Sequence, residues 1–163
     1  MSDESHTALH FRAATAADRP RLIEMINAAF ALETFLQGTR TDEVRLAEAT
    51  EKGEILLAEA NGGRILASVY VELRGKRGYM GMLAVDPGHQ KAGLGRQMLE
   101  AAEEHFRAKG CVAIDITVLS LRPELPPIYR RLGFVETGTE AFYPAQPLKD
   151  GLECHCIVMS KEL

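Results

Sequence analysis

Two glycines with basic neighbours follow an apolar segment in the middle of the chain. Gly93 and Gly95 are flanked by Lys91 and Arg96, and the apolar segment predicts a strand that ends at Val85. From Gly93 onward, apolar residues recur at helical spacing. The first N–H groups of a helix lack partners within it, and the helix dipole places positive potential there, so an anion can bind. The segment therefore predicts a phosphate or pyrophosphate site, although an ordinary strand–turn–helix corner has the same pattern.

Two common nucleotide motifs do not fit this turn. A P-loop needs Lys-Ser or Lys-Thr after its last glycine, whereas Leu94 follows Gly93 here. A dinucleotide fingerprint needs a third small residue, and that position is Met98. Asp115 lies at the distance of a ribose-binding acid, but too little chain follows to complete a doubly wound domain. A nucleotide-binding protein of another fold is therefore a weaker alternative.

Two segments together resemble one known family. Gln90-Lys-Ala-Gly93-Leu-Gly95, which follows Leu83-Ala-Val85, is similar to the acetyl-coenzyme A signature of the GNAT superfamily of N-acetyltransferases. Tyr129-Arg-Arg-Leu-Gly133-Phe134 resembles the Tyr-x-x-x-Gly-Phe motif that follows later in that family. The resemblance implies an α/β protein with the GNAT fold over residues 1–163. In that fold a mixed, mostly antiparallel sheet of seven strands is flanked by four helices, and two parallel strands splay apart in its middle.

The resemblance also implies acetyl-CoA as the co-substrate and assigns its contacts to two stretches, with no metal. Backbone groups around Leu83, Ala84 and Val85 are expected to pair with the pantetheine arm and to donate to the thioester carbonyl. The pyrophosphate is expected on backbone N–H groups of the turn, next to positive charge. The residues of this second stretch are Gln90, Lys91, Ala92, Gly93, Leu94, Gly95 and Arg96.

Tyr129 matches the family's acid tyrosine, four residues before Gly133. A phenol with a pKa near about 10 keeps its proton at neutral pH and can donate it to a departing thiolate. The other interpretation is a half-buried helical tyrosine that packs beside Leu125 and Leu132.

A general base is not carried over from the resemblance. The family often has a carboxylate on the strand before Leu83, and the matching position here is Tyr79. Glu33, Glu72 and His155 are candidates, and a chain of water to bulk solvent is an equal alternative.

Arg122 stands where the family often has an asparagine, seven residues before the acid tyrosine. That asparagine lies near the thiol end of coenzyme A, so Arg122 is a candidate for the same contact. It can instead pair with Glu124, face an acceptor that carries a carboxylate, or lie on the surface.

The acceptor walls are expected in two segments, residues 30–41 and 141–151. In the family these segments cover the amine, and Glu33, Phe35 and Tyr143 are the candidate acceptor contacts here. Phe35 and Tyr143 can equally well pack on the core.

The composition and net charge of the chain limit the classes of partner that we expect it to bind. The chain has 163 residues, of which 46% are hydrophobic, and a net charge of −4. Without a polybasic run or a long apolar run, neither nucleic acid nor a membrane is expected as a partner. The polar amino terminus argues against a signal peptide, and the three cysteines cannot all pair internally, so we expect a cytoplasmic protein with reduced thiols. A homodimer is an expectation from the family alone.

Periodicity and turn residues predict the order strand, two helices, three strands, helix, strand, helix, two strands. Asn61-Gly62-Gly63 is typical of a tight hairpin. In Cys154-His155-Cys156 the side chains of a strand alternate between faces, which argues against a metal site. The predicted strands span 9–13, 54–60, 64–73, 79–85, 111–119, 134–137 and 152–159, and helices end near 32, 52, 109 and 132.

The sequence thus predicts acetyl transfer from acetyl-CoA to a primary amine of a small molecule or a protein, by direct attack in a ternary complex. The alternative is a module that binds acyl-CoA without catalysis, which the missing base and the arginine at position 122 would suit.

Overall fold

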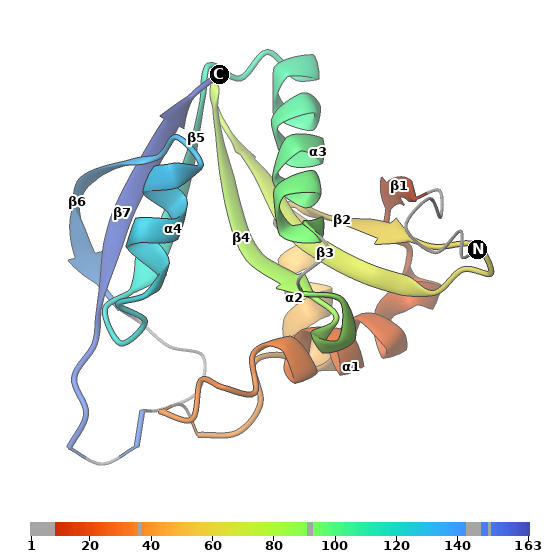
Figure 1. The fold of residues 1–163 in the computed structure, drawn as a ribbon, viewed down its shortest axis with the longest axis horizontal. Helices are drawn as coiled ribbons and strands as arrows, with labels where there is room; N and C mark the ends of the chain where they lie inside the picture. The colour runs from red at the N-terminus through yellow and green to blue at the C-terminus, as the bar shows by residue number, and fades with distance from the viewer. Residues whose placement is uncertain (1–8, 36, 91–92, 143–147, 150) are drawn as a thin grey trace.

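The computed structural model describes residues 9–35, 37–90, 93–142, 148–149 and 151–163, which form one mixed sheet with helices on both faces (Figure 1). Short 3-10 turns, η2 (Ala16–Asp18) and η3 (Pro87–His89), precede α1 and α3. The helices are α1 (Arg19–Ala29), α2 (Glu43–Lys52), α3 (Leu94–Ala108) and α4 (Leu125–Arg131). The strands are β1 (His10–Ala13), β2 (Glu54–Glu59), β3 (Ile65–Arg74), β4 (Arg77–Val85), β5 (Ala113–Leu119), β6 (Val135–Ala141) and β7 (His155–Glu162).

The sheet has seven strands in the order β1-β2-β3-β4-β5-β7-β6. Every neighbouring pair is antiparallel except β4 and β5, which are parallel and joined by the crossover helix α3. That pair is short, because Arg77, Gly78 and Tyr79 are the only β4 residues in register with β5. Beyond them the two strands diverge (Figure 1). The predicted GNAT fold, with two parallel strands splayed in the middle, is confirmed.

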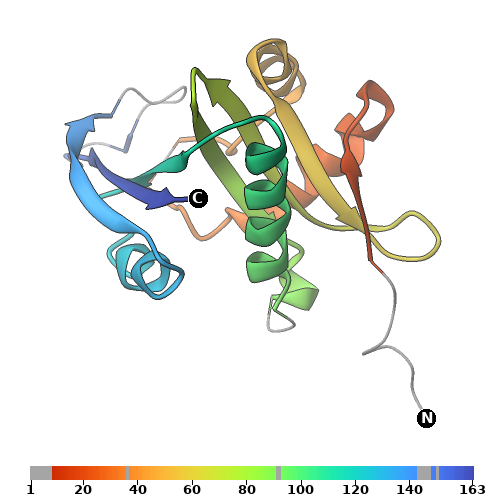
Figure 2. The ribbon, with the colours of Figure 1, turned by 90° about the horizontal axis from the view of Figure 1, so that it is seen from above.

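Two hydrophobic cores lie on opposite faces of the sheet. One packs α3 and part of α4 against β3, β4 and β5, around buried Met98, Phe106 and Phe134. The other packs α1 and α2 against β2, β3 and β4, around buried Ile26 and Leu46. Figure 2 shows the two helix layers with the sheet between them. The sheet is therefore covered on both faces near β4, which keeps the diverging strand in place.

The amphipathic pattern of α3 fixes how it crosses the sheet. Its apolar side, which includes Leu94, Met98 and Phe106, is buried. The Phe106 ring reaches β4 because position 78 is glycine, where a Cβ would lie 2.4 Å from the ring. This contact holds α3 against the start of β4, so that the amino end of the helix lies beyond the end of that strand.

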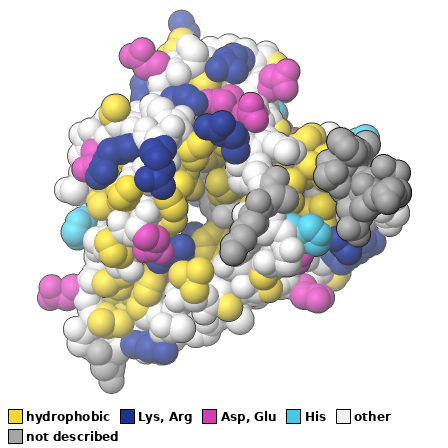
Figure 3. All heavy atoms as spheres, in the orientation of Figure 1, with side chains coloured by type: hydrophobic (Ala, Val, Ile, Leu, Met, Phe, Trp, Pro, Cys, Tyr) yellow, Lys and Arg dark blue, Asp and Glu magenta, His cyan; other side chains and the backbone are white. Residues whose placement is uncertain are grey.

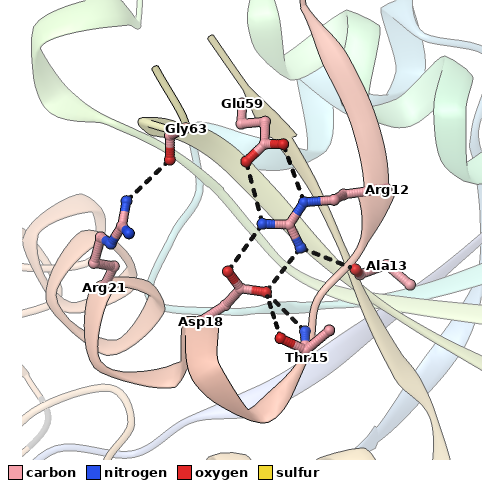
Figure 4. Close-up of polar contacts among 7 residues, drawn as sticks. All are labelled: Arg12, Ala13, Thr15, Asp18, Arg21, Glu59 and Gly63. Atoms are coloured by element: carbon pink, nitrogen blue, oxygen red, sulfur yellow. Dashed lines mark hydrogen bonds and ion pairs between the residues drawn. The ribbon is translucent and has the colours of Figure 1, made fainter. Parts of the chain in front are cut away.

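An ion-pair network fixes the amino-terminal edge of the sheet (Figure 4). Arg12 on β1 donates five hydrogen bonds, two each to the carboxylates of Asp18 and Glu59 and one to the Ala13 carbonyl oxygen. Asp18 also accepts from the Thr15 backbone N–H at 2.7 Å, in a capping box. The network therefore joins β1, β2 and the turn that leads into α1.

Several strands begin or end at other residues than the sequence predicts. Between the predicted strands 64–73 and 79–85, Arg74 pairs with Arg77, and only Gly75 and Lys76 form the turn. The last strand begins at His155 instead of residue 152, and β6 extends to Ala141 instead of residue 137. The pairing partners on the neighbouring strand, which local patterns do not contain, decide where these strands end.

The predicted hairpin at Asn61-Gly62-Gly63 is present, with positive φ at both glycines. Within the described segments, no helix is long and apolar enough to span a bilayer.

Candidate active site

The gap between the diverging strands is a cavity of about 120 Å³, which we call the β4–β5 cleft. Figure 3 shows a hollow in this part of the molecule, surrounded mainly by hydrophobic side chains and with basic side chains close by. Its walls come from both strands, from α4 and from the connection between α1 and α2. The lining residues are Phe30, Glu33, Arg40, Met80, Gly81, Met82, Leu83, Ile116, Thr117, Val118, Leu119, Arg122, Leu125 and Tyr129.

The β4 wall contains a bulge that the sequence did not predict. Ser68 pairs with Ala84 and Tyr70 pairs with Gly81, so two β4 residues, Met82 and Leu83, lie opposite the single residue Val69. Met82 has a φ of 48°, the only positive φ among the described non-glycine residues. A bulge takes backbone groups out of the regular ladder and re-aims them. Such groups, on an edge of β4 that β5 has left, are available to hydrogen-bond an extended ligand.

Tyr129 lies on the opposite wall, on α4. Its ring packs edge-on against buried Phe134, with 5.6 Å between the centroids, and no described residue hydrogen-bonds its hydroxyl. Burial raises the pKa of Tyr129 above its ordinary value, and the positive charge of Arg122 offsets only part of that rise. The phenol is therefore protonated at neutral pH and lines the cleft, as a general acid must.

Glu33 is a buried carboxylate between two arginines at the other side of the cleft. Its Oε1 accepts from Arg40 Nη1 at 2.8 Å, and its Oε2 accepts from Arg122 Nη1 at 2.6 Å. Arg122 also donates to Glu124 at 2.8 Å, so the predicted pairing with Glu124 is present. The Arg122 side chain is only 11% exposed, and the surface interpretation is therefore wrong. The ion pair between Arg122 and Glu33 links the β5–α4 connection to the α1–α2 connection, 89 residues away in sequence.

The three candidate general bases differ in their position relative to the cleft and in their hydrogen bonds. Glu33 lines the cleft, but both of its oxygens already accept hydrogen bonds from guanidinium groups. Glu72 lies outside the cleft, where hydrogen bonds from Arg74 and then Tyr70 lower its pKa. His155 begins β7, is exposed and lines no part of the cleft. Tyr79, at the family's base position, shares a hydrogen bond of 3.2 Å with the Thr117 hydroxyl at the point where β4 and β5 part.

The amino end of α3 follows the open end of β4. Gly93 caps the helix with a φ of 76° and supplies no capping side chain, and the first turn has no acidic residue. A Cβ at Gly95 would meet its nearest atom, on Val85, at 3.9 Å, so the protein's own packing does not require glycine there. This leaves room for a ligand on the first N–H groups, and exposed Arg96 adds positive charge.

Four other residues of this turn were predicted to bind the pyrophosphate, and the structure describes two of them. Gln90 is described, and its side-chain amide donates to the Val85 carbonyl oxygen at 3.4 Å. Leu94 is buried, so only its backbone is available. Lys91 and Ala92 lie outside the described residues.

A second cavity, of about 430 Å³, adjoins the cleft on the side of the α1–α2 connection. We call it the outer pocket. It shares Phe30, Glu33 and Arg40 with the cleft, and its other lining residues are Asn27, Ala31, Thr34, Gln37, Gly38, Thr39 and Lys149.

The two segments predicted as acceptor walls meet beside this pocket. The Lys149 backbone N–H donates to the Phe35 carbonyl oxygen at 3.0 Å, and Gln37 donates to the Leu148 carbonyl oxygen at 3.1 Å. The Phe35 side chain lines neither cavity, and Tyr143 lies outside the described residues.

Several lining residues were not singled out from the sequence, namely Met82 and Thr117, and also Phe30 and Arg40, which lie within the predicted wall segment 30–41. The Arg40 guanidinium lies over the Phe30 ring, 4.5 Å from its centroid. No local pattern distinguishes these residues from their neighbours, because the contacts that matter come from other elements.

The described residues contain no group of three side chains suited to hold a metal ion. Cys154 precedes β7, and Cys156 is buried within it.

Comparison with known proteins gives a match to one family model, described as an acetyltransferase (GNAT) domain, over residues 20–144. Among curated proteins, the mycothiol acetyltransferase of Saccharopolyspora erythraea is 27% identical over 130 residues, which are 77% of this chain and 43% of that protein. The chain is thus similar to less than half the length of that relative. The same holds for the mycothiol acetyltransferase of Propionibacterium freudenreichii, which is 36% identical over 45% of this chain and 24% of its own length.

Solved structures show the same fold at low sequence identity. The ribosomal-protein-S18-alanine N-acetyltransferase of Escherichia coli has a TM-score of 0.75 and 21% identity, over 95% of this chain and 94% of its own. The PaiA N-acetyltransferase of Thermoplasma acidophilum, solved with coenzyme A, has a TM-score of 0.75 and 14% identity, over 96% of this chain and 99% of its own.

Proposed function

The chain belongs to the GNAT acetyltransferase family, and we propose that it transfers an acetyl group from acetyl-CoA to a primary amine in a direct, ternary-complex reaction. The observation that carries this proposal is the β4–β5 cleft, with a β4 bulge on one wall and the protonated Tyr129 phenol on the other. Membership of the family also makes the alternative of a nucleotide-binding protein of another fold wrong.

The residues of the chain suit acetyl-CoA as a substrate. The open first turn of α3 offers N–H donors and Arg96 to its pyrophosphate, and the space beside Gly95 lets that group approach the backbone. The free edge of β4 around Leu83, Ala84 and Val85 offers backbone groups to the pantetheine arm. Fixed backbone donors stabilise negative charge on the thioester oxygen because they need no reorganisation during the reaction.

The reaction then needs three proton transfers. The amine nitrogen attacks the thioester carbon, the carbon–sulfur bond breaks, and the thiolate takes the proton of the Tyr129 hydroxyl. The nitrogen loses its extra proton to water, since Glu33 already pairs with two arginines. Tyr129 regains its proton from solvent, and atoms and charges balance.

Tyr129→Phe tests this assignment. Removal of a general acid is expected to lower kcat by about 100-fold with little change in the KM for acetyl-CoA. Coenzyme A release over a panel of amines measures the rate. Tyr70→Phe is the matched control, because Tyr70 is a buried tyrosine whose hydroxyl donates to Glu72 outside the cleft. Full activity in Tyr129→Phe, or a stable acetyl-enzyme, contradicts the mechanism.

A binding module without catalysis is the second candidate, and one observation favours it. The only carboxylate among the described residues that line the cleft is Glu33, and both of its oxygens are occupied. Calorimetric binding of acetyl-CoA with no coenzyme A release for any amine would support this candidate over the enzyme.

A further inference from the structure

We propose that the acceptor is a small amine that also carries an anionic group, a carboxylate or a phosphate, which binds Arg40 in the outer pocket. This inference rests on the proposed function, because it assigns the second substrate of the same reaction. It goes beyond that function by naming the acceptor's chemical class.

The two cavities are arranged to hold one molecule across both. Phe30, Glu33 and Arg40 line the cleft and the outer pocket alike, so the outer pocket opens next to the reaction site. Its volume of about 430 Å³ is in the range of pockets that bind small molecules. An amine that reaches the cleft from this side leaves the rest of the acceptor beside Arg40.

The outer pocket offers hydrogen-bond donors to that part of the acceptor. Arg40 donates one side-chain hydrogen bond among the described residues, to Glu33, and its side chain is 27% exposed. A guanidinium carries several N–H groups in a planar fork, which fits a carboxylate or a phosphate. Stacking on Phe30 holds the fork in place before a ligand arrives. Lys149 adds a second positive charge at the rim.

The described residues that line this pocket offer a cationic group no unpaired carboxylate. Glu33 is the only carboxylate among its described lining residues, and two guanidinium groups already take both of its oxygens. A polyamine tail would therefore face Arg40 and Lys149 without a free carboxylate to pair with. The charges favour an acceptor whose second group is negative.

Matched pairs of amines test the inference. Each α-amino acid is compared with its α-carboxamide, and O-phosphoethanolamine with ethanolamine, so that each pair differs in the anionic group. We expect kcat/KM to be about 10- to 100-fold higher for the anionic member of the preferred pair, mostly through KM. Whichever pair shows the larger ratio identifies carboxylate or phosphate as the ligand.

Arg40→Gln is expected to bring that ratio close to one, and Arg40→Lys to retain part of it. Arg19→Gln is the matched control, because Arg19 pairs with exposed Glu43 and lines neither cavity. An equal loss for both members of a pair in Arg40→Gln would mean a structural role and would overturn the inference.

The two proposals fail in different ways. If the wild-type chain acetylates neutral amines as well as anionic ones, the inference fails and the proposed function stands. If no amine of either class leads to coenzyme A release, both proposals fail. Calorimetry with acetyl-CoA then separates a binding module from a chain that does not bind the thioester.

Discussion

Two arginine–carboxylate networks, one at the β1 edge of the sheet and one at the cleft between its central strands, use the same groups differently. At the amino-terminal edge, Arg12 holds two carboxylates and donates five hydrogen bonds (Figure 4). At the cleft, Glu33 is held by two arginines, and Arg40 donates only one side-chain hydrogen bond among the described residues. We call these the edge network and the cleft network. The first saturates its arginine, and the second leaves unused donors on Arg40, which lines two cavities.

The size of a cavity does not separate the two regions. Arg12 lines a groove of about 600 Å³ between β1 and α3, which is larger than the outer pocket. Since the donors of Arg12 are already used within the protein, this groove offers no free guanidinium to a ligand. The proposed acceptor site thus differs from this groove in unused hydrogen-bonding capacity and not in volume.

The largest effect is expected from Arg122→Gln in the cleft network. The substitution leaves the buried Glu33 carboxylate with one partner, which disturbs the wall of the cleft. We expect kcat/KM to fall by about 100-fold, equivalent to about 2.7 kcal/mol of transition-state stabilisation. Steady-state kinetics with acetyl-CoA and the preferred amine measure it.

Arg130→Gln is the control on the neighbouring helix, since Arg130 pairs with Glu136 at 2.6 Å but is about half exposed. We expect its kcat/KM to stay within about twofold of wild type. Equal activities in Arg122→Gln and Arg130→Gln would mean that the cleft network matters no more for catalysis than an exposed ion pair.

A smaller effect, on stability alone, is expected from Asp18→Asn in the edge network. The amide cannot form the paired hydrogen bonds to Arg12 as a carboxylate does, and the Thr15 backbone N–H loses its charged acceptor. We expect the free energy of unfolding to fall by about 2 kcal/mol, measured by urea denaturation, with kcat/KM unchanged. Glu43→Gln removes an exposed ion pair of 3.5 Å and is expected to change stability by less than about 0.5 kcal/mol. A loss of activity without a loss of stability in Asp18→Asn would reverse the comparison.

The smallest effect is the pH dependence of the edge network. Hydrogen bonds from Arg12 hold the pKa of Asp18 well below its ordinary range. A carboxyl with a lowered folded-state pKa stabilises the fold above its unfolded pKa, near about 4, and loses that contribution as pH falls toward the folded value. The difference in unfolding free energy between wild type and Asp18→Asn should therefore be constant from about pH 5 to 8 and shrink below about pH 4. A difference that grows in acid would contradict the assigned sign.

Most of the fold was predictable because its signals are local. Alternating apolar residues in 65–73, the glycines of 61–63 and the amphipathic face of α3 each specify an element within one segment. The order of elements follows from these segments, and the resemblance to the GNAT family gave their arrangement. Strand ends such as Ala141 and His155 were placed wrongly, because the partner strand determines where pairing stops.

In the candidate site too, residues in local motifs were predictable, whereas residues brought together by tertiary contacts were not. Gly93, Gly95 and Tyr129 belong to short motifs and were recognised from the sequence. The pairing of Glu33 with Arg122 joins segments 89 residues apart and has no sequence signal. The orientation of Arg40 toward two cavities likewise depends on Phe30 and Glu33, which only the packed connection between α1 and α2 brings together.

The sequence alone determined the turn after Val85, the helix that follows it and the tyrosine four residues before Gly133, since each depends on neighbours along the chain. The tertiary structure decided where β4 and β5 separate, that Met82 takes a positive φ, and which arginine keeps unused donors. These features depend on hydrogen-bond partners from distant segments, and the saturation of a charged group is set only when all of its partners are in place.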